Sequence, residues 1–453
     1  MSEINEKIFK AYDIRGKYPE EINEEAVKKI SLAFLKFLSK GKGGSLKIVL
    51  GRDNRLSSKN LHKAVLAGFK NFGAKIIDLG LVPTPVFYFA VWQLKADGGI
   101  QITASHNPPS DNGLKIVGKN ALEIGKENGL EEIKNIAKSI DFSDNKKKLV
   151  IFKNKSIFKK FFVFNFQKSK IKLKKKLTIV FDTANAVSGL YIPQIKKYLP
   201  GKIYHLFSKL DGSFPNHSPN PLEEKNLEVL KNTVLEKKAD LGVAFDGDGD
   251  RIIFVSNKGE IIPSDIIASL IAKNLLSKNK GIKVVYNICS SNIIPETVKE
   301  LGGIPIVTKI GHTFVKDVMR KEKAEFGAEF SGHFYFKEFD YSEAPIFVLI
   351  KILEIIEKEE KPISEIILPF KKYFNSGQIN FETEDKNSKI KFLKEKYKNG
   401  KISTLDGLRV DFPNWWFIVR PSNTENLLRL NVEAKTKELL EEKIQEIKNL
   451  ILS

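Results

Sequence analysis

Three aspartates alternate with glycines after an apolar run in the segment ADLGVAFDGDGDRIIFV, residues 239–255. Carboxylates this close repel one another, and a cation bound by the oxygen atoms of Asp246, Asp248 and Asp250 removes the conflict. The glycines let the backbone turn the three carboxylates toward one point. An EF-hand calcium loop is excluded, because arginine follows Asp250 where that loop requires glycine. We therefore predict a metal site, with Mg²⁺ as the ion that phosphate chemistry favours.

A second polar loop follows the apolar run GGIQI, in QITASHNPPSDNGLKIV, residues 101–117. Its Ser105 hydroxyl becomes a good nucleophile only when a base or a cation assists it. His106 and Lys115 are close enough in sequence to provide proton transfer or positive charge. Taken alone, the loop is better explained as a turn, because Ser, Asn and Pro all favour turns. The aspartate loop favours the catalytic interpretation, since a metal there needs an oxyanion partner.

A third polar loop lies in AEFGAEFSGHFYF, residues 324–336. In an extended segment Glu329, Ser331 and His333 would point to one side. A carboxylate and a hydroxyl on one side suit the vicinal hydroxyls of a sugar, as acceptor and donor. A polar edge strand is the alternative interpretation.

A fourth loop, in VRPSNTENLLRL at residues 419–430, contains many hydrogen-bond donors. The guanidinium of Arg420 can bind a phosphate through two hydrogen bonds, and hydroxyl and backbone N–H groups can complete the site. The further donors are Ser422, Asn423 and Thr424. The alternative is an ordinary Ser-Asn-Thr turn before a strand.

The elements that position these loops repeat along the chain. Residues 46–80, 177–207 and 282–311 each show an apolar β-branched run, a polar loop, a helical period and a second run. This pattern predicts three α/β units with buried, mostly parallel sheets. Ligands of such units bind beyond the carboxyl ends of the strands, where the loops lie.

The C-terminal part differs, because alternating strands (LRVDF, WWFIVR and LLRLNVEA) precede an amphipathic helix. We therefore predict a smaller α+β domain after the three α/β domains. The domains expected are residues 1–150 with the serine loop, 151–256 with the aspartate loop, 257–370 with the sugar-binding loop, and 371–453 with the phosphate-binding loop.

Composition limits the class of protein. The chain has 453 residues with 42% hydrophobic and 29% charged residues, and Cys289 is its one cysteine. It has no apolar run of eighteen residues and no secretory signal, so we expect a cytoplasmic protein without membrane contact. The formal net charge is +20, with lysines concentrated in 144–162 and 168–177. No nucleic-acid recognition module accompanies them, which favours solvated surfaces that attract phosphorylated substrates over nucleic-acid binding.

With these loops in this order, the chain resembles the α-D-phosphohexomutase superfamily, in its phosphomannomutase/phosphoglucomutase branch. The shared motifs cover nearly the whole chain and are FKAYDIRG (9–16), GRDNR, TASHNPP, DGSFPNHSPNP (211–221), DGDGDR, KIGH (309–312), EFSGH and RPSNTE. The resemblance implies four domains arranged around a central cleft. It also implies conversion of hexose 6-phosphate to hexose 1-phosphate through a phosphoserine enzyme, with hexose 1,6-bisphosphate as intermediate and activator.

The resemblance also assigns roles to residues. Ser105 would carry the phosphoryl group and, with Asp246, Asp248 and Asp250, hold one Mg²⁺ per chain. The other catalytic residues implied are Tyr12, Arg15, His106 and Lys115, the last two for proton transfer. The substrate-binding residues implied are Arg251, Lys309, His312, Glu329, Ser331, His333, Arg420, Ser422, Asn423 and Thr424.

Two other functions are compatible with parts of the sequence. Phosphoglucosamine mutases have a similar SGH loop, and Phe330 departs from the usual Met or Gln among the sugar contacts, so the preferred sugar is open. A basic nucleic-acid-binding protein is the more remote alternative, and it leaves the four loops unexplained. We expect a phosphosugar substrate, no nucleic-acid or membrane partner, and a monomer or weak homodimer.

Overall fold

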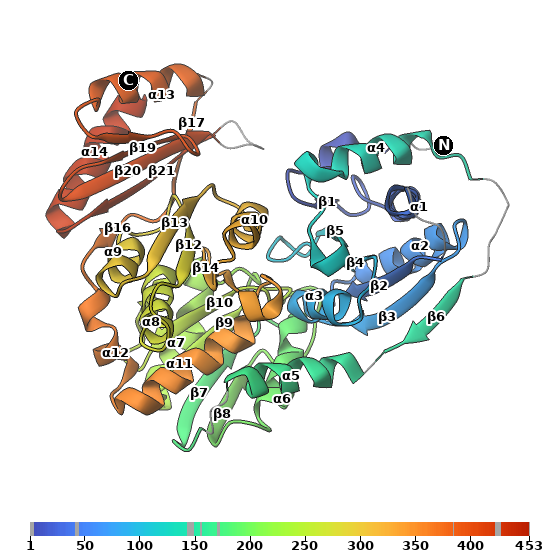
Figure 1. Cartoon of the computed structure of the whole chain (residues 1–453), viewed down its shortest axis with the longest axis horizontal. Coiled ribbons are helices and arrows are strands. Elements are labelled where there is room, and N and C mark those ends of the chain that lie inside the picture. Colours follow the sequence, from blue (N-terminus) through green and yellow to red (C-terminus); the bar gives the residue numbers. More distant parts are fainter. Residues whose placement is uncertain are drawn as a thin grey trace. The chain divides into compact units, whose positions relative to one another are not determined.

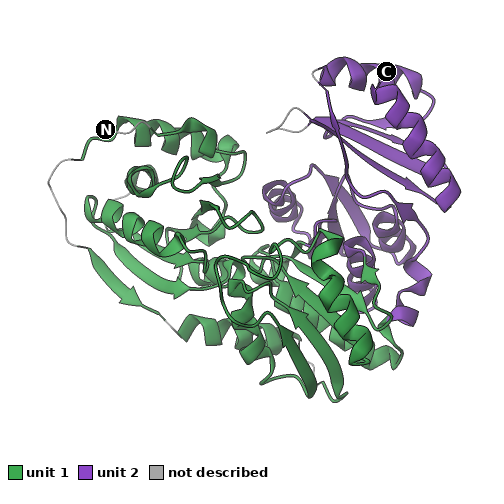
Figure 2. Ribbon diagram, turned by 180° about the vertical axis from the view of Figure 1, so that it is seen from behind, with its two compact units in different colours: residues 1–262, 333–363 green, residues 263–332, 364–453 purple. Residues whose placement is uncertain are grey.

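The computed structural model describes residues 4–40, 45–142, 149–154, 156–169, 173–383, 385–421 and 427–452. The chain divides into two compact units, shown in Figure 2. Unit 1 comprises residues 1–262 and 333–363, and unit 2 comprises residues 263–332 and 364–453. The predicted site residues fall into both units, so each unit is described by itself.

The first sheet of unit 1 has six strands in the order β1-β5-β4-β2-β3-β6. Strand β2 pairs in parallel with β3 and β4, and β3 with β6, whereas β5 is antiparallel to β1 and β4. The polar loops after β2 and β4 therefore lie at one edge of the sheet. The strands are β1 Ile14–Lys17, β2 Lys47–Arg52, β3 Lys75–Leu81, β4 Gly98–Ile102, β5 Asp111–Gly118 and β6 Val150–Lys153.

Helices cover both faces of this sheet (Figure 1). Gly99 of β4 faces Phe87, whereas its neighbour Ile100 belongs to the core that also contains Ile30 and Phe34. The first long helix begins where the side chain of Asn23 accepts the N–H of Ala26. The helices are α1 Glu24–Ser39, α2 Ser58–Lys70, α3 Thr84–Gln93 and α4 Leu130–Ser139.

The second sheet of unit 1 has the order β11-β10-β9-β7-β8, with β7 parallel to β8 and β9 and with β10 antiparallel to β9 and β11. The helix expected in repeat 177–207 is mostly a 3-10 turn, Val187–Tyr191, because Gly189 and Pro193 both disfavour a continuous α-helix. The strands of this sheet are β7 Leu177–Asp182, β8 Gly201–Leu206, β9 Leu241–Phe245, β10 Ile252–Ser256 and β11 Ile261–Ile262. The other elements of unit 1 are β15 Phe334–Phe336, which is not a strand of this sheet, and the helices α5 Ser156–Ser169, α6 Ile192–Ile195, α7 Glu228–Glu236 and α11 Pro345–Glu359.

Unit 2 contains a parallel sheet, in which β12 pairs with β13 and β14, and an antiparallel sheet around β20 and β21. The strands and closing helix predicted at the C-terminus are confirmed. The elements are β12 Lys283–Asn287, β13 Ile304–Thr308, β14 Phe326–Ala328, β16 Phe374–Asn375, β17 Ile379–Glu382, β18 Lys401–Ser403, β19 Leu408–Asp411, β20 Trp415–Pro421, β21 Leu427–Ala434, α8 Ser264–Leu276, α9 Ile293–Glu300, α10 His312–Glu322, α13 Lys386–Lys396 and α14 Lys437–Leu452, with α12 at Ile363–Ile366.

A buried arginine joins the two sheets of unit 2. Arg409 of β19 donates to the carbonyl of Ile288 at 2.6 Å and to Oδ1 of Asn292 at 2.7 Å. Its guanidinium lies 3.8 Å from the ring centroid of Trp416, whose Nε1 donates to Glu433 at 2.7 Å. These bonds fix the loop after β12 against β19 and β20, so the Glu329 and Arg420 regions are held within one unit.

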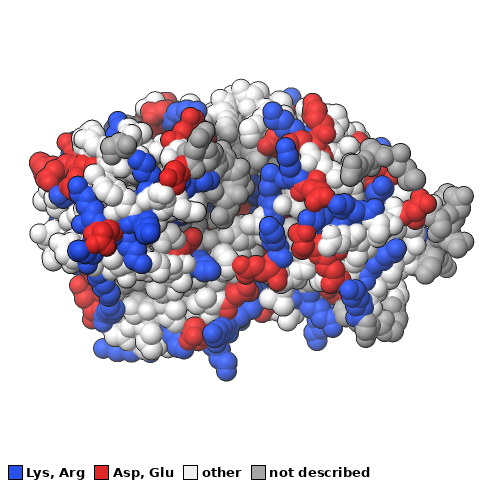
Figure 3. Space-filling view, turned by 90° about the horizontal axis from the view of Figure 1, so that it is seen from above, with Lys and Arg blue, Asp and Glu red and all other residues white. Residues whose placement is uncertain are grey.

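The predicted fold class is confirmed: α/β domains with mixed, mostly parallel sheets precede a C-terminal α+β domain. The exact domain boundaries and the central cleft stay predictions. No helix among the described residues is long and apolar enough to cross a membrane. The described lysines of the two basic segments are exposed, and basic side chains are distributed among acidic ones on the face seen in Figure 3.

Asp265, in the first turn of α8, makes the stability of unit 2 depend on pH. It is 9% exposed, and its Oδ2 accepts the N–H of Ser291 at 2.9 Å. Burial, despite that hydrogen bond, raises the pKa of its carboxyl from 3.8 to about 7. The unfolded chain therefore releases a proton that the fold retains, and stability falls as pH rises from about 4 to about 7.

We expect Asp265→Asn to stabilise the protein at pH 8 relative to pH 5, by up to about 2.6 kcal/mol in the difference between the two conditions, because about two pH units separate pH 5 from the pKa of the folded state. Asparagine keeps an oxygen for the Ser291 N–H but has no charge to desolvate. Thermal or urea unfolding at both pH values measures the effect. A wild-type to variant difference that is equal at both pH values would contradict the assignment.

Candidate functional site

Ser105 lies in the turn that follows β4 and is 2% exposed. Its backbone has φ +51°, in the left-handed region, and its N–H donates to Oγ1 of Thr103 at 2.9 Å. The hydroxyl donates to Oδ2 of Asp246 at 2.8 Å and lies 3.2 Å from Nδ1 of His106. Unit 1 therefore brings the serine loop and the aspartate loop together, although 141 residues separate them.

The three aspartates follow β9, whose five residues are all buried. Oδ1 of Asp246 accepts the N–H groups of Asp250 and Arg251 at 3.1 and 3.2 Å, which folds the loop back on itself. Burial, and then the neighbouring carboxylates of Asp250 and Asp248, raise the pKa of Asp246 well above its ordinary value. The fold thus holds three carboxyl groups close together in a buried place, where a bound cation would offset their mutual repulsion.

Asp248 provides a direct test of whether the residues fit a metal. Its carboxylate is 0% exposed, and Oδ2 accepts the hydroxyl of Thr84 at 2.6 Å. Oδ1 is buried and has no hydrogen-bond partner within the described ranges. A buried carboxylate oxygen without a donor, beside two further carboxylates, is the ligand set that a hard cation such as Mg²⁺ needs.

Lys115 of β5 neutralises part of this charge. Its Nζ lies 2.9 Å from Oδ2 of Asp248 and 2.5 Å from Oδ2 of Asp250. Burial lowers the pKa of Lys115, but the two carboxylates outweigh burial and raise it above its ordinary value. In this arrangement Lys115 stays charged, which favours a role in balancing charge over a role in proton transfer.

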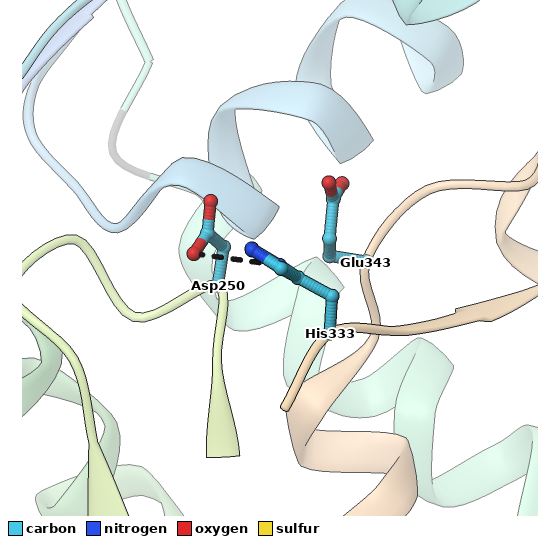
Figure 4. A group of neighbouring side chains, drawn as sticks. All are labelled: Asp250, His333 and Glu343. Atoms are coloured by element: carbon cyan, nitrogen blue, oxygen red, sulfur yellow. Dashed lines mark ion pairs between the residues drawn. The ribbon is translucent and has the colours of Figure 1, made fainter. Parts of the chain in front are cut away.

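A second acidic group, Asp250 with His333 and Glu343, is drawn in Figure 4. Nδ1 of His333 faces Asp250 at 3.7 Å from its Oδ1, and Glu343 lies beside the ring. Arg251 donates its Nε–H to Nε2 of His333 at 3.0 Å, so the ring hydrogen is on Nδ1. A protonated Nδ1 does not ligate a metal, so the three aspartates fit a metal ion better than this group does.

His106 and Arg15 lie at the serine. Burial, followed by the charges of Arg251 and Arg15, lowers the pKa of His106 well below its ordinary value, so its imidazole is neutral. Arg15 of β1 donates to Asp13 at 2.7 Å and to the side chain of Asn107 at 2.8 Å. Tyr12, in the bend before β1, is partly exposed.

The predicted sugar-binding loop of unit 2 is not extended. Glu329 directly follows β14, Phe330 and Ser331 form a turn, and Gly332 has φ +86° with its N–H donating to the Glu329 carbonyl at 3.1 Å. The expectation that residues 329, 331 and 333 point to one side of a strand is therefore wrong, because the glycine permits a left-handed turn. Glu329 is 3% exposed, and its Oε2 accepts a hydrogen bond from Nδ2 of Asn287 at 3.3 Å.

The remaining predicted residues of unit 2 lie at strand ends. Lys309 is exposed after β13, with its Nζ 5.4 Å from the Phe314 ring, and His312 begins α10. Arg420 lies near the end of β20, and its buried Nε has no hydrogen-bond partner in the described part of the chain, which suits an anion-binding side chain. The predicted phosphate ligands Ser422, Asn423 and Thr424 lie outside the described residues.

Sequence reasoning missed three residues at the site. The hydroxyl of Thr84 donates to Asp248, Glu343 lies beside His333, and Arg55 donates to the Ser105 carbonyl of the serine loop. Of the three, only Arg55 lies in a motif that the resemblance covers, GRDNR, and that motif indicates no role for it. Thr84 and Glu343 lie in stretches without a catalytic pattern, and only the tertiary fold brings them to the aspartates.

Comparison with known proteins gives consistent matches over the chain. Models of the phosphoglucomutase/phosphomannomutase family match with alpha/beta/alpha domain I at residues 6–144, domain II at 158–259, domain III at 263–373 and the C-terminal domain at 379–450. A phosphomannomutase from Methanocaldococcus jannaschii is 37% identical over 454 residues, covering 98% of this chain and 97% of that protein. The phosphomannomutase/phosphoglucomutase of Pseudomonas aeruginosa is 35% identical over 441 residues, covering 96% and 93%. The crystal structure of a phosphoglucomutase/phosphomannomutase family protein from Burkholderia thailandensis superposes with a TM-score of 0.89 at 30% identity, covering 99% and 97% of the two chains.

Proposed function

Because the chain belongs to the phosphoglucomutase/phosphomannomutase family and is a phosphohexomutase, an isomerase, we propose that it interconverts the 6- and 1-phosphates of mannose and glucose through a phosphorylated Ser105. The observation that carries this proposal is the 2.8 Å contact between the Ser105 hydroxyl and Asp246, inside a buried cluster of three aspartates. A hydroxyl beside a cation site is suited to carry a phosphoryl group.

The proposed reaction has two transfers. Phosphoserine gives its phosphoryl group to the free hydroxyl of a hexose phosphate, forming the 1,6-bisphosphate and the Ser105 hydroxyl. The bisphosphate then turns over in the site, and its other phosphate returns to Ser105. Each transfer moves one proton from the attacking hydroxyl to the leaving oxygen, and the neutral imidazole of His106, 3.2 Å from Oγ, is placed to hold it.

Charge stabilisation at the serine comes from the chain and from a metal. Mg²⁺, held by Asp246, Asp248, Asp250 and the phosphoserine, would supply electrostatic stabilisation of the transferring phosphoryl group. Lys115 balances the aspartates, and Arg15 and Arg251 add positive charge near the serine. His333, whose Nε2 accepts from Arg251, keeps that arginine in place.

For unit 2 we propose roles in substrate recognition. Glu329 and Ser331 are proposed to bind the sugar hydroxyls, with Lys309 and His312 nearby. Arg420 is proposed to hold the phosphate that is not reacting, together with Ser422, Asn423 and Thr424. Such a phosphate site must accept either end of the sugar, so it recognises phosphate and not one ring position.

A substrate panel tests the preferred sugar. With Mg²⁺ and a trace of hexose 1,6-bisphosphate, we expect the kcat/KM values for mannose 1-phosphate and glucose 1-phosphate to exceed that for glucosamine 1-phosphate by roughly tenfold or more. The reason is that a site built for the sugar 2-hydroxyl loses a hydrogen bond, or gains a charge, when an amine replaces it. The highest kcat/KM on the glucosamine phosphate would instead support phosphoglucosamine mutase, the alternative within the superfamily.

A further inference from the structure

Arg55, the last residue of the motif GRDNR at the end of β2, makes hydrogen bonds to four carbonyl oxygens of the serine loop. One terminal nitrogen donates to the carbonyls of Pro108 at 2.5 Å and Asp111 at 3.0 Å. The other donates to those of Ser105 at 2.8 Å and Asn107 at 2.7 Å. The side chain of Arg55, 50 residues before Ser105 in sequence, thus provides hydrogen-bond donors to four backbone carbonyls of this loop.

The serine loop needs such a partner. Between β4 and β5 the chain forms turns. The turn bonds satisfy some of its carbonyls, such as that of Pro108, which accepts the N–H of Asp111 at 3.0 Å, and the others need donors from elsewhere in the fold. Ser105 also adopts φ +51°, a conformation that a residue with a side chain keeps only when its surroundings enforce it. The guanidinium provides that constraint directly at the Ser105 carbonyl.

Arg55 is itself fixed in place. Its side chain is buried, and its Nε lies 3.2 Å from Oδ2 of Asp53. The backbone N–H of Arg55 donates to Oδ1 of the same aspartate at 3.0 Å. The ring of Phe214 covers the guanidinium, with 5.1 Å between its centroid and Cζ. A guanidinium held on these sides is a rigid template for the loop, which a flexible surface arginine would not be.

The metal loop contacts the Ser105 carbonyl as well. A Cβ atom on Gly247 would lie 2.2 Å from the Ser105 carbonyl oxygen, so the backbone of the aspartate loop approaches that oxygen closely. The carbonyl is therefore in contact with both Gly247 and Arg55. Any shift of the serine loop away from Arg55 changes the position of Ser105 relative to Asp246 and its neighbours.

We propose that Arg55 is a positioning residue for phosphoryl transfer, whose guanidinium holds the strained serine loop so that Oγ of Ser105 stays at the aspartate cluster. The proposal rests on the proposed function, because it takes Ser105 as the residue that carries the phosphoryl group. Arg55 acts through the loop and not on the substrate. Four carbonyls require the planar fork of arginine, and the ammonium of lysine, with three donors on one atom, does not reach all of them.

The test compares Arg55→Lys with Arg52→Lys. Arg52 belongs to the same motif but donates to the Asp53 carbonyl at 3.0 Å and is the matched control. We expect Arg55→Lys to lower kcat roughly 10- to 100-fold, because a small displacement of a reacting group has that effect, and to change KM by less than about twofold. Arg52→Lys is expected to keep kcat within about twofold of the wild type.

Intact mass separates failure of this proposal from failure of the proposed function. Wild-type protein incubated with glucose 1,6-bisphosphate should gain one phosphoryl group, and Arg55→Lys should gain it more slowly by the same factor as kcat. If the wild type gains none, the phosphoserine function fails. If the wild type gains it and Arg55→Lys does so at the wild-type rate, Arg55 does not position the serine.

Folding is checked by thermal unfolding of each variant. If Arg55→Lys does not fold, Phe214→Leu takes its place, since it removes only the ring that covers the guanidinium. For that variant we expect a kcat roughly threefold or more below the wild type, again at a nearly unchanged KM. A Phe214→Leu protein that matches the wild type in kcat and in phosphorylation rate overturns the proposal.

Discussion

Ser105→Ala is expected to lower the turnover of mannose 1-phosphate by at least roughly 10⁴-fold, the range seen when an enzyme loses its nucleophile. The variant keeps the arginine and lysine side chains around the site but lacks the oxygen that would carry the phosphoryl group. Its fold should persist, because the deleted hydroxyl contacts only Asp246 at 2.8 Å and His106 at 3.2 Å among the described residues, and one hydrogen bond contributes about 1 kcal/mol. Coupled assay of hexose 6-phosphate formation gives the rate, and intact mass gives the phosphorylation state.

Ser110→Ala is the matched control for this experiment. Ser110 lies on the same loop, is exposed, and its hydroxyl contacts the neighbouring Asp111 at 3.2 Å. We expect it to change turnover by less than about twofold, as surface substitutions away from special features do. Retention of turnover in Ser105→Ala would show that another group accepts the phosphoryl and would refute the phosphoserine proposal, whatever the result for Ser110.

The sequence predicted the features that depend on local pattern. Alternating apolar runs and helical periods identified the α/β units, and loops at strand ends identified where chemistry would lie. The aspartate spacing in residues 246–250 and the Ser105 loop were predicted to share a site, and the structure places Oγ of Ser105 2.8 Å from Asp246. Residue type and spacing within each loop indicated that the two loops lie together, whereas the roles of their residues stay predictions.

Features that depend on tertiary contacts were not predictable in the same way. Thr84 contacts Asp248 across 164 positions of sequence, and Arg55 serves a loop 50 residues away. The turn at Gly332 replaced the expected extended segment, because a left-handed glycine is not distinguishable from an extended one by residue type alone. The helix expected within the repeat 177–207 was shortened by a glycine and a proline whose effect the apolar pattern concealed.

Asp248→Asn is expected to have the second large effect, a fall of roughly 10²- to 10³-fold in turnover at a fixed low Mg²⁺ concentration, since a bound metal contributes several kcal/mol to stabilising transferred charge. Asparagine has nearly the same shape and keeps an acceptor for the Thr84 hydroxyl. It removes one negative charge and turns one oxygen into an amide group, which weakens binding of a hard cation. The Mg²⁺ concentration for half-maximal activity should therefore rise, by about 10²-fold or more if Asp248 is a direct ligand.

Thermal unfolding tests the same assignment without using activity. Saturating Mg²⁺ should stabilise the wild type by about 2.7 kcal/mol at one hundred times its dissociation constant, and it should stabilise Asp248→Asn much less at the same concentration. Without metal, the variant should be at least as stable as the wild type, because the buried carboxylates no longer repel as strongly, although Lys115 loses one of two partners. Asp240→Asn is the matched control: Asp240 precedes the same strand β9 at its other end, where its Oδ2 accepts the Thr178 N–H at 2.8 Å, so its Mg²⁺ response should equal that of the wild type. Equal Mg²⁺ responses in Asp248→Asn and the wild type would mean that Lys115, and not a metal, neutralises Asp248 in the working enzyme.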